Sequence, residues 1–212
     1  MKKKLFILIA MLLAAGIPIV LAKQKSIPVE EKISLDASQE YLTEEQIQQL
    51  RSEYPLAQEG ALAEYIPYTL EEFLAHIPII AIGTVQGQLE NYTVVFNQPS
   101  PENGYPGSFL EFEQYQFRVD ECITSYQELE GEILTIAIRK DRKNEYPSLQ
   151  KGTQLLLPLE PMSGSHSGKY TIGYDVSFYL VKGYLLAASQ KDYGLNGMRL
   201  DKANLFLKPS EK

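Results

Sequence analysis

The stretch Ile79-Ile80-Ala81-Ile82-Gly83-Thr84-Val85-Gln86-Gly87-Gln88 decides the fold of this chain. Pro78 precedes it and β-branched residues dominate its first half, a composition typical of a buried β-strand. Gly83, inside the run, predicts a bulge or a tight bend, which a curling sheet requires. The chain therefore enters β-structure at residue 79.

Further β-rich segments follow at intervals that suit neighbouring strands. In the segment 112–119, the alternation places Glu113, Tyr115, Phe117 and Val119 on the inward face. The tight Lys182-Gly183 connection predicts a hairpin. The remaining segments are an extension of the first strand at 92–96, then 132–140, 153–159, 170–181 with an interruption at Asp175, and 184–188.

Short helices are predicted only outside this series of strands. The sequences Thr43-Glu44-Glu45-Gln46 and Thr69-Leu70-Glu71-Glu72 each match a capping box, so each predicts a helix start. The second helix is expected to end at His76, where the imidazole can bond a last carbonyl. The pattern therefore predicts a mainly β fold that closes into an antiparallel barrel, because closure removes exposed strand edges.

The succession of motifs resembles small exported domains of Gram-positive bacteria, in which a short helix leads into a strand ending in Ile/Val-Gly-Thr-Val. The resemblance covers about residues 69–188 and includes no catalytic motif. It implies a single OB-like barrel of five or six strands preceded by two short helices, in a group whose function is largely unknown. The residues that carry it are Thr69–Phe73, Ile79–Val85, Tyr115–Val119, Leu129–Gly131, Ile133–Ile138 and Pro147–Leu159, with Gly152 ahead of the aliphatic strand.

The amino terminus has the layout of an export signal. Three lysines at positions 2–4 precede an uncharged, mostly apolar run, Leu5–Ala22, and small or moderate residues at Val20 and Ala22 suit a signal peptidase. Residues 1–22 are therefore a signal peptide or a retained membrane anchor, and both place the remainder on the extracellular side of the membrane.

The expected organisation after the leader has four parts. These are a linker at 23–40, a helical lead-in at 41–68, a β-barrel domain at 69–195 and a C-terminal tail at 196–212, which is expected to dock on the outside.

The net charge of −7 argues against nucleic-acid binding, because an acidic chain repels phosphate backbones. Contact with the membrane is expected only through residues 5–22. The basic run Arg139–Lys143 is short and is interpreted as a solvated strand end. Cys122 is the only cysteine, so no internal disulfide forms, and it is expected to be a small buried apolar group.

Tyrosine is the residue type that suggests binding. The chain has 14 tyrosines and no tryptophan, and Tyr presents an apolar body with a polar tip. Tyr92, Tyr105 and Tyr126 fall near predicted loops and are the binding candidates, with the loop 97–108 as the favoured surface. No catalytic residue, metal ligand or cofactor site is predicted: His166 lies in a Ser/Gly loop that offers a general base no support, and Asp192–Gly197 is interpreted as a turn.

Three functions fit these observations. The first is an exported, non-catalytic interaction module whose partner is an envelope or secreted protein. The second is a cell-wall or glycan hydrolase using Glu111 and Glu113, which share a strand face at about 7 Å. The third is an inhibitor of secreted proteases.

Overall fold

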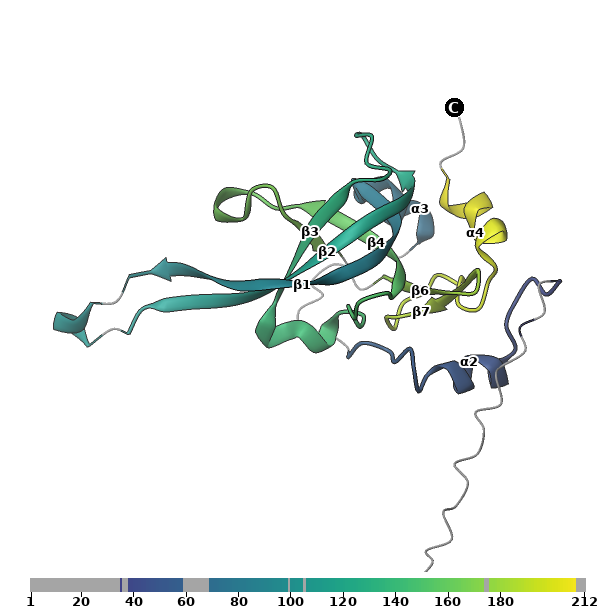
Figure 1. The fold of residues 1–212 in the computed structure, drawn as a ribbon, viewed down its shortest axis with the longest axis horizontal. Helices are drawn as coiled ribbons and strands as arrows, with labels where there is room; N and C mark the ends of the chain where they lie inside the picture. Colours follow the sequence, from purple (N-terminus) through teal and green to yellow (C-terminus); the bar gives the residue numbers. More distant parts are fainter. Residues whose placement is uncertain are drawn as a thin grey trace, which may run out of the picture. The chain divides into compact units, whose positions relative to one another are not determined.

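The computed structural model describes residues 35, 38–58, 69–98, 100–104, 106–173 and 176–208 (Figure 1). Clustering of contacts divides the chain into two units, 1–33 and 34–212, and every described residue belongs to the second. The predicted leader, most of the predicted linker and the junction 59–68 lie outside the described residues. None of the helices in the described part of the chain has the length and apolarity needed to cross a lipid bilayer.

The strands of the described residues form one seven-stranded sheet, in the order β1-β2-β3-β5-β4-β6-β7. An additional pairing of β1 with β4 closes five of these strands into a ring, in the order β1-β2-β3-β5-β4. Their bounds are β1 (Ile79–Asn97), β2 (Ser108–Thr124), β3 (Ile133–Arg139), β4 (Gln154–Pro161), β5 (Tyr170–Ile172), β6 (Phe178–Val181) and β7 (Tyr184–Ala187). The mainly β class predicted from the sequence is confirmed.

The prediction of purely antiparallel pairing is wrong at one junction. Strand β3 pairs with β5 in parallel, through Ile136 and Tyr170, whereas the other neighbours in the ring are antiparallel. The reason is topological, since strands that alternate in direction cannot close a ring with an odd number of members. One parallel pair is therefore required.

The predicted strand over 170–181 is two strands with different neighbours. Strand β5 pairs with β4 at its far end, Leu159–Pro161, whereas β6 pairs with β4 at Leu155 and Leu156. The two strands therefore occupy different positions along β4, and residues 174 and 175 between them lie outside the described residues. Strands β6 and β7 then form the predicted hairpin, with Lys182 and Gly183 both at positive φ (50° and 87°) as a type I′ turn requires.

The predicted irregularity at Gly83 is confirmed. The register between β1 and β2 shifts between Ile82 and Gly83, and a Cβ on Gly83 would lie 2.3 Å from the Arg118 carbonyl oxygen and 2.6 Å from the Phe117 ring. Glycine is required here because the neighbouring strand approaches its Cα closely.

Helices α2 (Glu44–Leu50) and α3 (Leu70–His76) begin at the predicted capping boxes, with both reciprocal hydrogen bonds formed at Thr43 and at Thr69. A third helix, α4 (Leu200–Leu207), follows the sheet, and short 3₁₀ turns lie at η1 (Pro101–Asn103), η2 (Lys140–Glu145) and η3 (Gly164–His166).

One apolar core joins the sheet to the helices that precede and follow it in the chain. Phe73 of α3 and Ala203 and Leu207 of α4 belong to the same buried cluster as residues of β1, β4, β6 and β7. The tail expected to dock on the outside therefore completes the core. The start of the tail is also hydrogen-bonded to β7: the Leu185 amide donates to the Met198 carbonyl at 2.8 Å.

Candidate functional site

Strands β1 and β2 continue beyond the ring as a two-stranded arm. Pairing of β1 with β4 ends at Thr84, and pairing of β2 with β3 ends at Phe112. Beyond the Tyr92–Phe112 pair, as far as the Asn97–Ser108 pair, the two strands have no other strand partner among the described residues. We call residues 92–112 the β-arm, which Figure 1 shows leading away from the other strands of the sheet toward the left.

The tip of the β-arm exposes large apolar side chains. Val95 and Phe109 form a cross-strand pair on one face and are 49% and 65% exposed, and the neighbouring Phe96 is 57% exposed. Contiguous exposed apolar groups on a folded chain indicate an interaction surface. The loop at the end of the arm is shorter than the predicted 97–108, because Asn97 and Ser108 still belong to strands.

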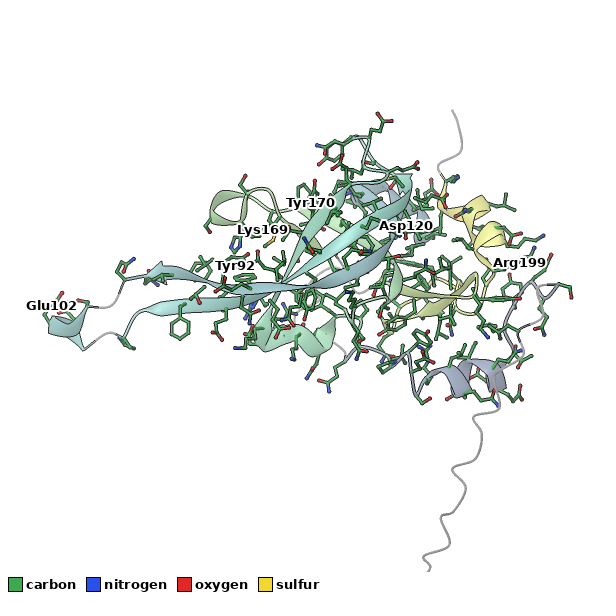
Figure 2. The ribbon with its side chains drawn as sticks, in the orientation of Figure 1. Tyr92, Glu102, Asp120, Lys169, Tyr170 and Arg199 are labelled. Carbon is green, nitrogen blue, oxygen red and sulfur yellow. The ribbon has the colours of Figure 1, made fainter. Side chains whose placement is uncertain are left out.

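The base of the β-arm is held by an aromatic cluster that includes Tyr92. The Tyr92 and Phe112 rings stack with centroids 5.1 Å apart, and His166 of η3 packs edge-on against both rings. The Tyr92 hydroxyl and His166 Nδ1 are 2.5 Å apart and hydrogen-bonded. The Lys169 ammonium lies 4.7 Å from the centre of the Tyr92 ring, and Figure 2 labels both residues where the connection between β4 and β5 meets the arm.

This cluster has the chemistry of a structural clamp. Burial raises the pKa of Tyr92 further above its ordinary value, which already leaves the phenol neutral at physiological pH, so the hydroxyl can keep its hydrogen bond to His166. Tyr92 and Phe112 hold His166 in place, so the histidine has a support that its Ser/Gly surroundings did not predict. The clamp joins the arm to the β4–β5 connection and fixes where the arm leaves the ring.

The predicted tyrosines do not gather into one site. Tyr92 lies half-buried at the base of the β-arm, whereas Tyr126 is 61% exposed in the turn after β2. The strand from Phe112 to Thr124 separates them by up to about 40 Å at 3.3 Å per residue. Tyr105 lies outside the described residues.

The paired carboxylates considered for a hydrolase have different environments. Glu111 is exposed and forms an ion pair with Lys140 at 2.9 Å. Glu113 is 6% exposed, accepts a hydrogen bond from the Tyr115 hydroxyl at 2.6 Å and lies 3.6 Å from the Lys143 ammonium. Both carboxylates are thus neutralised by cations of η2. Neither lines the hollow between residues 55–58 and 143–151 that is described below.

The other residues singled out by their chemistry have structural contacts. His76 ends α3, and its Nδ1 donates to the Glu72 carbonyl at 2.7 Å, as predicted. Cys122 is half-buried rather than buried, and burial is the main cause of its raised thiol pKa. Within the predicted turn, the Asp192 carboxylate accepts from the Gly194 amide and the Asn196 side chain accepts from the Ala187 amide.

Most residues of the arm site were missed by sequence reasoning. Phe96 and Phe112 were assigned to strand positions without a role, and Phe109 and Lys169 were not considered. The available signal was length: a β-pattern that continues from residue 79 to residue 97 is far longer than a usual strand of 5–6 residues. Such a strand must extend beyond the sheet that it helps to build.

Comparison of the chain with models of protein families, with curated proteins and with solved structures gave no match.

Proposed function

We propose that this protein is an exported, non-catalytic interaction module of the bacterial cell envelope, and that the β-arm is the surface that binds a partner protein. The leader pattern supports a location outside the cytoplasmic membrane. The exposed tip of the β-arm is the observation that carries the proposal.

An OB-like fold is part of this proposal. The ring order β1-β2-β3-β5-β4 is consistent with a five-stranded Greek-key barrel of this class. Such barrels bind ligands through the loops between their first two and their last two strands. In this chain those two connections are the β-arm and residues 162–169, which meet at the Tyr92–His166 contact.

The physical cost of the β-arm favours a bound partner. A two-stranded hairpin without a covering layer is marginally stable in water. The arm also presents backbone edges that are unpaired among the described residues, and such edges accept an added strand. A partner that covers the Val95–Phe109 face would bury apolar surface and stabilise the arm.

The charge of the β-arm favours a protein over a nucleic acid. Residues 92–112 contain Glu102 and Glu111 but no lysine or arginine, and Glu111 is paired with Lys140 of η2. The carboxylate of Glu102 near the tip repels phosphate backbones, whereas a protein surface with an apolar centre and a basic rim complements the tip. We therefore expect a partner with that kind of surface.

The test is crosslinking in intact cells followed by capture of the tagged full-length protein. The arm variant carries Val95→Thr and Phe109→Thr, which keep β-propensity but remove the apolar pair. The matched control carries Leu205→Gln and Phe206→Gln, because these side chains of α4 are also exposed, at 75% and 54%.

We expect the wild-type and control proteins to capture one dominant, saturable protein partner and the arm variant to lose it. A Tyr105→Ser variant tests the predicted loop candidate in the same assay. Retention of the same partner by the arm variant would contradict the assignment of the arm as the binding surface.

A further inference from the structure

A hollow of about 620 Å³ lies beside the ring, and none of its lining residues belongs to the β-arm. It is formed between the segment Pro55–Gln58 after α2 and the connection 143–151 that leads from η2 into β4. Tyr115, Tyr146 and Tyr179 contribute to its walls. The volume falls within the range of small-molecule sites.

Hydrogen bonds between separate segments build this pocket. The Gln58 amide donates to the Asn144 carbonyl at 2.7 Å, and the Ala57 amide donates to the Ala188 carbonyl at 2.7 Å. The Tyr179 hydroxyl donates to the Pro55 carbonyl at 3.1 Å and accepts from the Ser148 amide at 2.8 Å. The two walls are therefore fixed to each other and to the sheet before any ligand arrives, which reduces the entropy lost on binding.

The charge of the lining is opposite to the charge of the chain. Among the lining residues that the structure describes, the charged ones are Lys143 and Lys151, and none is acidic, although the whole chain has a net charge of −7. The Glu113 carboxylate lies 3.6 Å from the Lys143 ammonium and offsets part of its charge. Lys151 is exposed and forms no ion pair within the described part of the chain. The pocket therefore favours an anion.

The remaining lining groups suit a polyhydroxylated ring. Gln58, Gln88, Asn144 and Gln150 are among the lining residues, and a side-chain amide can offer both a donor and an acceptor to hydroxyl groups. The Gln88 amide nitrogen already donates to the Asn91 side chain at 3.4 Å. The C–H faces of a sugar pack well against tyrosine rings, which supply rigid apolar contact area at low entropic cost. Tyr115 and Tyr146 are partly exposed and can supply such contacts, whereas Tyr179 is 1% exposed and supports the wall from within.

We infer that this pocket binds a hexose-sized sugar that carries a carboxylate or a phosphate, with Lys151 as its principal charge contact. Tyr115, Tyr146 and the side-chain amides supply contacts to the ring and hydroxyl groups. The inference is independent of the β-arm, because the lining residues and the arm residues do not overlap.

The experiment measures dissociation constants by ligand-observed NMR, with the full-length protein in nonionic detergent. The probes are glucuronic acid, glucose 6-phosphate and glucose. Lys151→Met removes the charge from the pocket and Lys151→Arg restores it. Lys140→Met is the matched control, because it removes the same charge from neighbouring η2, where Lys140 pairs with exposed Glu111 and does not line the pocket.

We expect at least one acidic sugar to bind about tenfold or more tightly than glucose, and Lys151→Met to remove that advantage. Tight binding of glucuronic acid alone assigns the carboxylate, and tight binding of glucose 6-phosphate alone assigns the phosphate. Lys151→Arg and Lys140→Met should bind as the wild type does, and added salt should weaken the acidic sugars only.

Equal affinity for all three sugars, no binding of any of them, or equal losses in Lys151→Met and Lys140→Met would overturn the inference. Crosslinking of the partner protein by Lys151→Met should remain unchanged. Failure at the pocket is thereby distinguished from failure at the arm.

Discussion

At the scale of single residues, the buried carboxylate of Glu113 needs a hydrogen-bond donor and a nearby cation to offset its loss of solvation. Its Oε2 accepts a hydrogen bond from the Tyr115 hydroxyl at 2.6 Å, and the ammonium of Lys143 lies 3.6 Å from Oε1. Tyr115→Phe removes the hydroxyl donor, so the buried carboxylate loses this hydrogen bond. We expect the free energy of unfolding to fall by about 1–3 kcal/mol.

Chemical denaturation followed by circular dichroism measures this effect. Tyr126→Phe is the control, because Tyr126 is 61% exposed, and its change should stay within about 0.5 kcal/mol. Equal stability of the two variants would show that the Tyr115–Glu113 bond contributes nothing.

Alkaline pH provides a second test at the residue scale. Burial raises the pKa of Tyr115, with the Glu113 hydrogen bond adding to it, and burial also raises the pKa values of Tyr146 and Tyr179. In the unfolded chain tyrosines ionise near pH 10, so above that pH the unfolded chain binds fewer protons than the folded one. The free energy of unfolding is therefore unaffected by tyrosine ionisation below about pH 10 and decreases as the pH rises above that value.

Ultraviolet absorbance of tyrosinate measures this titration. The native protein should ionise part of its tyrosines only at a pH where the chain unfolds, whereas the protein in denaturant should titrate in one step. A native titration curve that matches the denatured one would contradict the assigned burial.

Prediction from the sequence worked for residues whose role follows from their neighbours along the chain. Strand alternation placed Phe117 and Val119 on the inward face, and both are buried. The partner of Glu113, Lys143, is 30 positions further along the chain, in a run interpreted only as a solvated strand end. Long-range pairing of this kind has no local signal.

At the scale of elements, the bulge at Gly83 determines how closely β1 and β2 approach. A methyl group at Gly83 would meet the backbone of Arg118 at 2.3 Å as well as the Phe117 ring, and a strand backbone cannot move aside cheaply. Gly83→Ala should therefore lower the free energy of unfolding by about 3 kcal/mol, at the upper end of overpacking costs.

Thermal and chemical denaturation check this value, with Glu90→Ala as the control at an exposed position of the same strand. A Gly83→Ala protein as stable as its control would mean that the two strands separate easily at the bulge.

The existence of the elements could be predicted, but their extent could not. Helix starts at Thr43 and Thr69 follow from capping chemistry, and β1 from its run of β-branched residues. The β-arm depends on where β3 and β4 stop pairing with their neighbours, which is a property of the assembled sheet. For the same reason, the break between β5 and β6 was placed near Asp175 but was not recognised as a shift from one stretch of β4 to another.

At the scale of the whole molecule, the C-terminal tail makes the β-sheet and its helices one structural unit. Sequence reasoning expected residues 196–212 to dock on the outside of the barrel. The structure separates them: Leu207 is 1% exposed in the core that includes Phe73, whereas Leu205 on the same helix is 75% exposed.

This difference gives a matched pair of substitutions on α4. Leucine and alanine have similar helix propensities, so the comparison isolates burial. Leu207→Ala opens a cavity between α4 and the core and should lower the free energy of unfolding by about 2–5 kcal/mol. Leu205→Ala should change it by less than about 0.5 kcal/mol.

Denaturation followed both by circular dichroism and by tyrosine fluorescence makes the comparison at the scale of the whole fold. Because α4 shares one core with α3 and the sheet, both probes should report a single transition, shifted to lower denaturant in Leu207→Ala. Two separate transitions, or a Leu207→Ala protein as stable as Leu205→Ala, would show that the tail folds as an appendage, as the sequence interpretation had it.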